Sequence, residues 1–466
     1  MIDEYKKIVV LGAGLTGLTI AHELSSVFKN QLIVLEKENF LGGLATTLSN
    51  DGLAFDLGSH RLHKDFPKKI IRYIENLLGE KLLNRERKSV IYHQGRFLNY
   101  PPKLCNLLSK FSINEIANFL IDFFRNTPNI IKNKPPENFE EATVKRTGRL
   151  IYESFFHDYA LKLWGLDPKE ISPDALKKRK TVLNLRSFWE IFSFKNHFFY
   201  YPKNGTGEIS KNLATSFKNK GGQIYLNTEI KKIVLVNKQI KEIIFKDQNG
   251  NEVTCPVLLL ITTIPLEDFE KLIFPSDYHE SSLQWRGLRT LFFLLDEALP
   301  FENETFYFCS QKTSFFRVSQ ISKYSPYLNR SSKGTFLSVE FLVTAEDKIW
   351  EKTEQELLAD TIKDLIEVRI LKKEPQITKY FSFKLPKVYP LYKKGWKENF
   401  TKIFKNLLEI ENLFVLGRGG FFLHCNIDHS LIQGLELSKL IKKNNWQNKK
   451  MWRKMTEKFQ AFSARD

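Results

Sequence analysis

Three glycines and one acidic residue near the start of the chain have the types and spacing of a dinucleotide-binding turn. Gly12, Gly14 and Gly17 form the pattern Gly-x-Gly-x-x-Gly, and Glu36 follows nineteen residues after the last of them. In such a turn the first glycine permits a tight bend, the second lets the backbone approach a pyrophosphate, and the third lets a helix pack closely on a strand. The acidic side chain accepts hydrogen bonds from a ribose. The four residues together predict a site for a dinucleotide.

The elements that must position this turn are also indicated by the sequence. The apolar run Ile8–Leu11 predicts a parallel strand covered on both faces, residues 18–28 predict a helix, and Gln31–Leu35 predicts a second strand that ends at Glu36. The glycine turn alone is a weak signal. A strand, a helix and a second strand around it form the complete unit, which is specific.

A glycine pair, Gly42-Gly43, follows Glu36 by six and seven residues. Many FAD enzymes carry such a pair where the chain turns back along the cofactor, so the pair favours FAD over NAD. We therefore expect FAD as the cofactor. In this part of the chain we expect it to contact Gly12, Gly14, Leu15, Thr16, Gly17, Glu36, Lys37, Gly43 and Leu44.

The 466 residues exceed the usual size of one hydrophobic core, so several domains are expected. Residues 66–199 are mostly helical in pattern, with Ile113, Ile116, Leu120 and Phe124 at helical spacing. We predict an α/β fold with a Rossmann-type FAD-binding domain built from discontinuous segments, a helical lid and a mixed-sheet substrate domain. The predicted boundaries are 1–65, 200–265 and 405–445 for the FAD-binding domain, 66–199 for the mostly helical substrate or lid domain, 266–404 for the β-sheet substrate domain, and 446–466 for a basic amphipathic C-terminal helix.

The chain is basic, with 71 Lys and Arg against 53 Asp and Glu and a formal net charge of +18. A solvated lysine surface is the favoured interpretation, and an anionic substrate or an acidic membrane surface is the sharper alternative. Because no recognised nucleic-acid motif is present, we predict no nucleic-acid partner. The C-terminal segment places Trp452, Met455, Phe459 and Phe462 at helical spacing among lysines. It predicts a helix that docks on the protein or, alternatively, one that lies on a membrane surface.

Four cysteines, Cys105, Cys255, Cys309 and Cys425, form no CxxC pair and have no metal-ligand spacing beside histidines. Reduced thiols and no metal site are therefore expected. We find no secretory signal in the sequence, and the longest apolar run, Val257–Leu266, is too short to span a bilayer. A cytoplasmic protein is predicted, with peripheral binding to the inner face of the membrane as the alternative.

Further motifs resemble the UDP-galactopyranose mutase-like flavoproteins, which belong to the larger group of amine oxidase- and protoporphyrinogen oxidase-like FAD enzymes. The segment Val9–Leu18 is common to the whole group. The segment Phe55–His63 resembles the mutase pattern aromatic-x-x-Gly-x-His, whose histidine lies against the flavin. The resemblance covers most of the chain, and its other matches are Pro136–Glu141, Tyr159–Gly165, Tyr201–Gly207, Phe315–Val318, Tyr389-Pro390 and Leu416–His429.

The resemblance implies roles for particular residues. It adds Gly58, Ser59, His60, Gly417, Arg418 and Ile427 to the flavin contacts, and it makes His60, Arg317 and Arg179 the catalytic candidates. His424 and Cys425 are departures, because the mutases usually have tyrosines just before the matching Asp-Met. The residues implied to bind the substrate are Tyr159, Trp164, Arg179, Asn204, Arg317, Tyr389 and His424.

Several of these residues have a structural interpretation as well. His60 and Trp164 could be ordinary core residues, and Arg179 lies in a basic run that could be a solvated face. Arg317 is flanked by apolar residues and needs an anionic partner. A substrate phosphate and a structural carboxylate are the two alternatives.

The resemblance implies an FAD-dependent mutase, an isomerase, that acts on a nucleotide-diphosphate sugar. In this reaction N5 of reduced FAD attacks the anomeric carbon, the diphosphate leaves, and the flavin N5–sugar adduct opens and recloses with a different ring size. Arginines and tyrosines would hold the departing diphosphate, His60 would keep the flavin in its reactive state, and NAD(P)H is a candidate reductant.

Two other functions stay open. An FAD-dependent oxidoreductase of the amine oxidase or protoporphyrinogen oxidase type shares every FAD motif, although Leu416-Gly417-Arg418 differs from the Ala-Gly-Glu/Asp usual in amine oxidases. A flavin-binding protein without catalysis, a partner of a glycosyltransferase, is the third. The sequence leaves the oligomeric state open.

Overall fold

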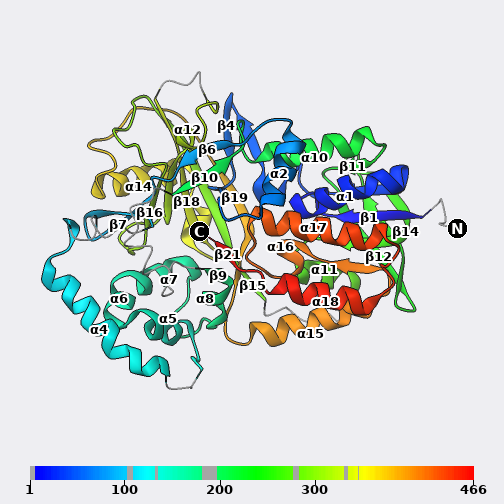
Figure 1. Cartoon of the computed structure of the whole chain (residues 1–466). Helices are drawn as coiled ribbons and strands as arrows, with labels where there is room; N and C mark the ends of the chain where they lie inside the picture. Colours follow the sequence, from blue (N-terminus) through cyan, green and yellow to red (C-terminus); the bar gives the residue numbers. More distant parts are fainter. Residues whose placement is uncertain are drawn as a thin grey trace.

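The fold of the chain is given by a computed structural model, which describes residues 6–101, 106, 109–131, 135–180, 197–275, 283–329, 334–344 and 346–465. Figure 1 shows two lobes. In one lobe a sheet that contains β1 and β14 is covered by α1, α10 and α17, and in the other a second sheet lies beside the helices α4 to α8. Cys105 lies outside the described residues, whereas Cys255, Cys309 and Cys425 are free thiols.

The sheet of the first lobe is assembled from three distant parts of the sequence. Its order is β11-β2-β1-β14-β13-β12, and β20 pairs with β14. The pairs β11–β2, β2–β1, β1–β14 and β14–β20 are parallel, whereas β14–β13 and β13–β12 are antiparallel. The strands are β1 (Lys7–Leu11), β2 (Leu32–Leu35), β11 (Gln223–Tyr225), β12 (Glu229–Val236), β13 (Gln239–Lys246), β14 (Glu252–Thr262) and β20 (Leu413–Val415).

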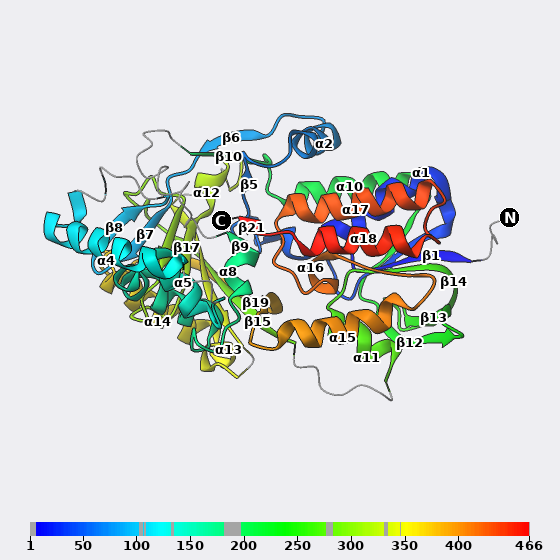
Figure 2. The same ribbon diagram turned by 60° about the horizontal axis from the view of Figure 1, so that its bottom comes forward.

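Helices cover both faces of this sheet, which explains why its central strands are continuous apolar runs. Figure 2 shows α1, α10 and α17 on one side of the strands and α11 and α15 on the other. Glycine permits the close contact of α17 with α1, because a Cβ on Gly434 would lie 2.7 Å from Thr19 Cβ. The helices of this lobe are α1 (Leu15–Phe28), α2 (Lys68–Leu78), α10 (Gly207–Asn219), α11 (Leu266–Ile273), α15 (Trp396–Leu408), α16 (Gly417–Gly420), α17 (Ile427–Lys442) and α18 (Lys449–Gln460).

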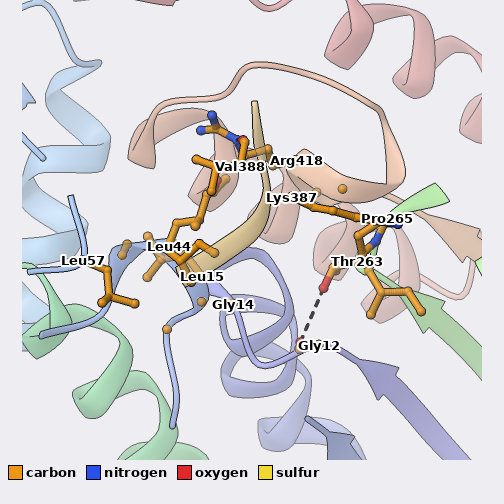
Figure 3. A pocket seen from close by; sticks show the side chains of 18 of the residues that line it. Gly12, Gly14, Leu15, Leu44, Leu57, Thr263, Pro265, Lys387, Val388 and Arg418 are labelled. Carbon is orange, nitrogen blue, oxygen red and sulfur yellow. Dashed lines mark hydrogen bonds between the residues drawn. The ribbon is translucent and has the colours of Figure 1, made fainter. Parts of the chain in front are cut away.

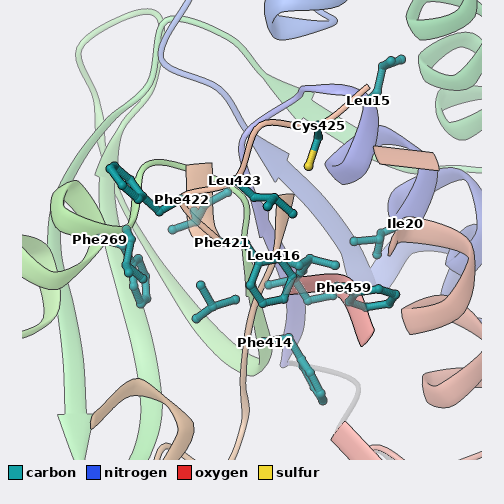
Figure 4. Close-up of a cluster of buried hydrophobic side chains, with 14 of the residues drawn as sticks. Leu15, Ile20, Phe269, Phe414, Leu416, Phe421, Phe422, Leu423, Cys425 and Phe459 are labelled. Atoms are coloured by element: carbon teal, nitrogen blue, oxygen red, sulfur yellow. The ribbon is translucent and has the colours of Figure 1, made fainter. Parts of the chain in front are cut away.

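The C-terminal helix α18 is docked on this lobe. Trp452 and Phe459 are 1% and 0% exposed, and the Trp452 ring packs on Phe414 with 5.0 Å between ring centroids. Figure 4 shows Phe459 in one cluster with Phe414 and Phe421. The apolar side of the predicted amphipathic helix therefore faces the core of the protein. Among the described residues, no helix is both long enough and apolar enough to cross a membrane.

The sheet of the second lobe has the order β19-β15-β18-β17-β16-β7-β8 and is antiparallel except for the pair β16–β7. Helices α13 (Lys348–Glu351) and α14 (Glu354–Glu367) pack against it. The strands are β7 (Val90–His93), β8 (Arg96–Asn99), β15 (Gln284–Leu295), β16 (Thr305–Phe308), β17 (Arg317–Gln320), β18 (Thr335–Val343) and β19 (Ile377–Leu391).

Residues 66–199 are less uniformly helical than the sequence predicts, because several strands also lie within them. β6 (Leu83–Glu86) joins a small sheet with β5 (Leu62–His63) and β10 (Phe198–Tyr201), while β7 and β8 form a hairpin at the edge of the second sheet. The hairpin turn is Gln94-Gly95, and both residues have positive φ, as a two-residue turn of type I′ requires. The helices of this region are α4 (Ile113–Ile131), α5 (Phe139–Thr147), α6 (Arg149–Ile151), α7 (His157–Trp164) and α8 (Asp174–Lys178).

Short pairings complete the fold. The hairpin of β3 (Thr47–Asn50) and β4 (Leu53–Asp56) follows the first βαβ unit, and α12 (Ile321–Tyr324) follows β17. At the other end of the chain, β21 (Ala464–Arg465) pairs in parallel with β9 (Arg179–Lys180), which directly follows α8. The C-terminal residues therefore connect the first lobe to the helical region.

Candidate functional site

A cavity of about 870 Å³ lies where the carboxyl ends of the parallel strands of the first sheet meet. Its lining includes the residues at the ends of β1, β2, β14 and β20, and parts of β15, β17 and β19 from the second sheet. In open α/β sheets ligands bind at this edge. Figure 3 shows Gly12 and Gly14 across the cavity from Val388 and Arg418. Of the predicted site residues, those that line the cavity are Gly12, Gly14, Leu15, Thr16, Glu36, Lys37, Gly43, Leu44, Gly58, Ser59, His60, Arg317, Tyr389, Gly417, Arg418, His424 and Ile427.

The glycine turn between β1 and α1 has the geometry that a pyrophosphate needs. Gly12 has a φ of +97°, and a Cβ on Gly17 would lie 2.1 Å from the Gly12 carbonyl oxygen. A Cβ on Gly14 meets no atom within 4 Å, and Gly14 lines the cavity. The open space beside Gly14 at the N-terminus of α1 therefore fits the phosphates of a dinucleotide. Gly17 itself serves the packing of α1 and is not among the lining residues.

Glu36, at the end of β2, is 9% exposed and lines the same cavity. Its carboxylate accepts hydrogen bonds from the backbone N–H groups of Ala13, at 2.6 Å, and Glu38, at 3.0 Å. Burial raises the pKa of Glu36, and these two hydrogen bonds act in the opposite direction. Each carboxylate oxygen has a second lone pair, so the group retains acceptors for ribose hydroxyls.

His60 is held by the glycine-pair segment. Its Nε2–H donates to the Leu44 carbonyl oxygen at 2.8 Å, and burial lowers the pKa of the imidazole. A neutral ring with this bond carries its proton on Nε2 and leaves Nδ1 as an acceptor. The neighbouring Ser59 hydroxyl lies 2.6 Å from Ser319 Oγ and donates to the Glu340 carboxylate at 3.1 Å. These bonds attach the 58–60 segment to the second sheet.

Arg317 on β17 is paired with a carboxylate. Its Nε donates to Glu340 Oε1 at 2.8 Å, and its Nη2 donates to Glu340 Oε2. Glu340 on β18 is 0% exposed, so the ion pair is buried, and it raises the pKa of Arg317 against the opposing effect of burial. The structure thus supplies the structural carboxylate that the sequence left as one of two alternatives. Arg317 also lines the cavity, and Nη1 of its guanidinium takes no part in the ion pair with Glu340.

Arg418 is held differently from Arg317. Its Nε donates to the Val388 carbonyl oxygen at 2.8 Å, its Nη1 donates to that of Cys425 at 3.1 Å, and its guanidinium lies 5.1 Å from the centre of the Tyr389 ring. The buried Nη2 has no hydrogen-bond partner among the described residues. Burial lowers the pKa of Arg418, and the charge of Arg179 acts in the same direction. The His424 ring packs on Tyr389 at 5.1 Å between centroids.

Arg179 and Tyr159 lie next to this end of the cavity without being among its lining residues. The Arg179 guanidinium is 5.8 Å from the centre of the Tyr159 ring, and that ring packs on Phe316 at 6.2 Å. Arg179 is 5% exposed, so it does not belong to a solvated face. The three arginines 179, 317 and 418 thus gather around one end of the cavity.

Two predicted substrate residues lie elsewhere. Trp164 is 2% exposed and packs on Tyr392 in the core, at 6.2 Å between ring centroids, because the last turn of α7 faces inward. Asn204 is exposed, and its amide and backbone N–H groups donate to Glu208 at the start of α10. Neither residue is among the lining residues of the cavity, so their predicted contact with a substrate stays a prediction.

Other lining residues were missed by the sequence analysis. Residues 263–265 follow β14 and 227–230 lead into β12, so the rule that ligands bind at the carboxyl ends of parallel strands would have found the first group. Glu340, the partner of Arg317, does not line the cavity, but it had a signal as well, because it is the only charged residue in the apolar strand Thr335–Val343. Trp285 and Lys387 line the cavity from β15 and β19, and no sequence motif marks them.

The fold and the cavity define a dinucleotide-binding protein of two lobes. Residues 15–399 match the family described as flavin containing amine oxidoreductase. The chain belongs to this family and is a flavin-dependent enzyme of the amine oxidase superfamily. The match bears out the predicted resemblance to this group of flavoproteins.

Proteins similar to this chain include two sugar mutases. A probable UDP-galactopyranose mutase of Klebsiella pneumoniae is 27% identical over 216 residues, which are 45% of this chain and 53% of that protein. The dTDP-fucopyranose mutase of Escherichia coli is 24% identical over 246 residues, 48% of this chain and 56% of that protein. The chain thus spans about half the length of the curated relatives it matches. The crystal structure of a reduced UDP-galactopyranose mutase has the same fold, with a TM-score of 0.77 and 21% identity over 94% of this chain and 96% of that one.

Proposed function

We propose that this protein is an FAD-dependent mutase, an isomerase, that changes the ring of the sugar in a nucleotide-diphosphate sugar. The observation that carries the proposal is the cationic end of the cavity, where Arg317 and Arg418 line the wall and Arg179 lies close behind it. A diphosphate carries the complementary charge, and planar guanidinium groups bind phosphate oxygens through paired hydrogen bonds. The similarity to two nucleotide-sugar mutases supports the same substrate class.

The glycine turn and Glu36 would hold the pyrophosphate and ribose of FAD, while the 58–60 segment and residues 417–427 would hold the flavin end. The space beside Gly14 and the acceptors that Glu36 retains fit this assignment. When bound in its reduced form, FAD supplies a nucleophilic nitrogen, N5, to the anomeric carbon of the sugar. NAD(P)H is the proposed reductant.

The side chains have the task of holding a leaving group. Arg418 is suited to it, because its buried Nη2 has no hydrogen-bond partner, and its charge no carboxylate partner, among the described residues. A phosphate oxygen would accept a hydrogen bond from this Nη2 and would balance the charge of Arg418. Tyr389 lies against Arg418, His424 packs on Tyr389, and the polar atoms of these two side chains would complete the contact with the diphosphate. Neutral His60, fixed by Leu44, would accept a hydrogen bond at Nδ1.

An oxidoreductase is the second candidate, because the matching family is named for amine oxidation. The charges at the cavity argue against an amine substrate. An ammonium ion would be placed among three arginines, and like charges at short range in a buried site repel strongly. A neutral substrate without a hydrogen-bond acceptor would leave the buried Nη2 of Arg418 without a partner.

The test is to incubate dithionite-reduced protein with UDP-galactopyranose or a dTDP-sugar without oxygen and to separate the products by chromatography. We expect a ring-isomerised sugar nucleotide only with reduced protein. Arg418→Met should abolish turnover, and Arg453→Met, at an exposed arginine on α18, should not. If oxidised protein is instead bleached by an amine and no sugar isomer forms, the oxidoreductase replaces the mutase.

A further inference from the structure

Residues 462–465 leave the end of α18 and cross from the first lobe to the helical region, where they pair with the strand that carries Arg179. Figures 1 and 2 both place β21 beside β9, between α8 and the first lobe. This segment, called the C-terminal strap here, contributes no lining residue to the cavity. Its contacts nevertheless reach residues on two sides of that cavity.

One end of the strap is fixed near the proposed flavin site. The Phe462 ring stacks on His429, with 4.5 Å between centroids and 13° between planes. His429 Nδ1 accepts a hydrogen bond from the backbone N–H of Asn426 at 3.3 Å, which caps the N-terminus of α17. Asn426 and Ile427 line the cavity. Phe462 therefore rests on the residue that shapes this part of the wall.

The other end is fixed to the segment that contains Arg179. The Ser463 hydroxyl donates to the Lys177 carbonyl oxygen at 2.6 Å, and the Lys178 ammonium donates to the Gln460 carbonyl oxygen. Ala464 pairs in register with Arg179 and is 1% exposed. Three consecutive residues, 177–179, are thus tied to the strap and the end of α18 through backbone or side-chain contacts.

These ties act against an electrostatic cost. Arg179 is buried close enough to Arg418 for its charge to lower the pKa of the Arg418 guanidinium. Like charges held near one another repel. A backbone tie from the first lobe to the 177–180 segment keeps Arg179 in place against this repulsion. The same closeness of charges favours binding of a dianion between them.

We propose that the C-terminal strap is a positioning device that holds Arg179 beside Arg418, so that both arginines face one diphosphate group. The inference rests on the proposed function for its ligand and on the contacts of residues 460–465 for its mechanism. The strap residues touch no substrate in this scheme. They act through Arg179.

The test uses a chain that ends at Phe462, which keeps the stacking on His429, and the milder variant Ser463→Ala. Three quantities are measured: bound flavin per protein, amide hydrogen exchange in peptides that cover 174–180, and the affinity of the reduced protein for UDP. We expect unchanged flavin content, faster exchange in 174–180, and a UDP dissociation constant raised by about tenfold in the shortened chain. Ser463→Ala should show a smaller effect in the same direction. Ser26→Ala, which removes an exposed serine hydroxyl of α1, is the matched control.

A double-mutant cycle separates positioning from general damage. In an Arg179→Ala background, shortening the chain should produce no further loss of UDP affinity, because the strap acts through that side chain. An equal loss in both backgrounds overturns the proposal, and so does unchanged exchange in 174–180. If the wild-type protein does not bind UDP, the proposed function fails. The exchange rates alone then decide whether the strap fixes the segment.

Discussion

Arg317 and Arg418 line the same cavity, yet the structure predicts different stability costs when each is removed. Arg317→Ala leaves the fully buried Glu340 carboxylate without its cation. Breaking a buried ion pair in this way costs about 3–5 kcal/mol of folding free energy. Arg418→Met removes two charge-assisted hydrogen bonds to carbonyl oxygens, worth about 1.5–3 kcal/mol each, but it also removes a buried cation whose desolvation opposes folding. We therefore expect Arg418→Met to change the free energy of unfolding by less than about 2 kcal/mol.

The measurement is urea denaturation of the flavin-free proteins, in which tryptophan fluorescence reports the fraction unfolded. Flavin-free protein is needed because a bound cofactor stabilises the fold by mass action, and the variants bind it to different degrees. A third variant, Arg317→Ala with Glu340→Gln, removes the charge that the single substitution strands. It should recover most of the lost stability, and the coupling between the two positions should amount to several kcal/mol. Recovery of stability should not restore affinity for a nucleotide diphosphate.

The reasoning is refuted if Arg317→Ala unfolds within about 1 kcal/mol of the wild type. Such a result would mean that water or another cation compensates Glu340. It is refuted equally if Glu340→Gln fails to rescue the single variant, because the cost would then arise from packing around Arg317 and not from charge.

Three further predictions concern other parts of the molecule. Gly14→Val should abolish flavin retention by filling the open space at the turn, and Gly14→Ala should weaken it less; both are read as bound flavin per purified protein. Burial lowers the pKa of Lys162 to about 8. The unfolded chain therefore binds a proton that the folded chain lacks between about pH 8 and 10.4, and the wild type should gain stability relative to Lys162→Met as pH rises through this window. A constant difference between the two proteins across the window would exclude that pKa. Trp452→Ala should cost about 3–5 kcal/mol in urea denaturation while flavin content at low temperature stays the same, and a loss of flavin without a loss of stability would contradict the docked position of α18.

The nucleotide turn was predictable because all of its determinants are close together in sequence. Gly12, Gly14, Gly17 and Glu36 lie within one βαβ unit, and each spacing follows from the geometry of a strand, a turn and a helix. The family resemblance extended the prediction to the 58–60 segment and to residues 417–427, which line the same cavity. The α/β class followed from the same elements.

The ion-pair partners of side chains could not be predicted from the sequence, because they depend on which distant strands become neighbours in the sheet. Arg317 meets Glu340 only because β17 pairs with β18 in a register that places the two residues opposite each other. Helical spacing alone also failed to identify the buried face of α4. Ile113 and Phe124 are 82% and 64% exposed, although they share the spacing of an apolar face with Leu120. Local periodicity shows that a stripe exists, and the tertiary packing decides whether it is covered.

The order of strands in the first sheet has a consequence for synthesis of the chain on the ribosome. β1 and β2 are made first, but their neighbours β11 and β14 lie about two hundred residues later, and β20 lies at 413–415. The wall formed by residues 417–427 emerges later still. Long sequence separations of this kind slow folding and leave sheet edges unpaired in the nascent chain. FAD can meet its complete binding site only after residues 417–427 have left the exit tunnel, so capture of the cofactor should come late in the folding of these two lobes and should be a sensitive point for chaperone assistance.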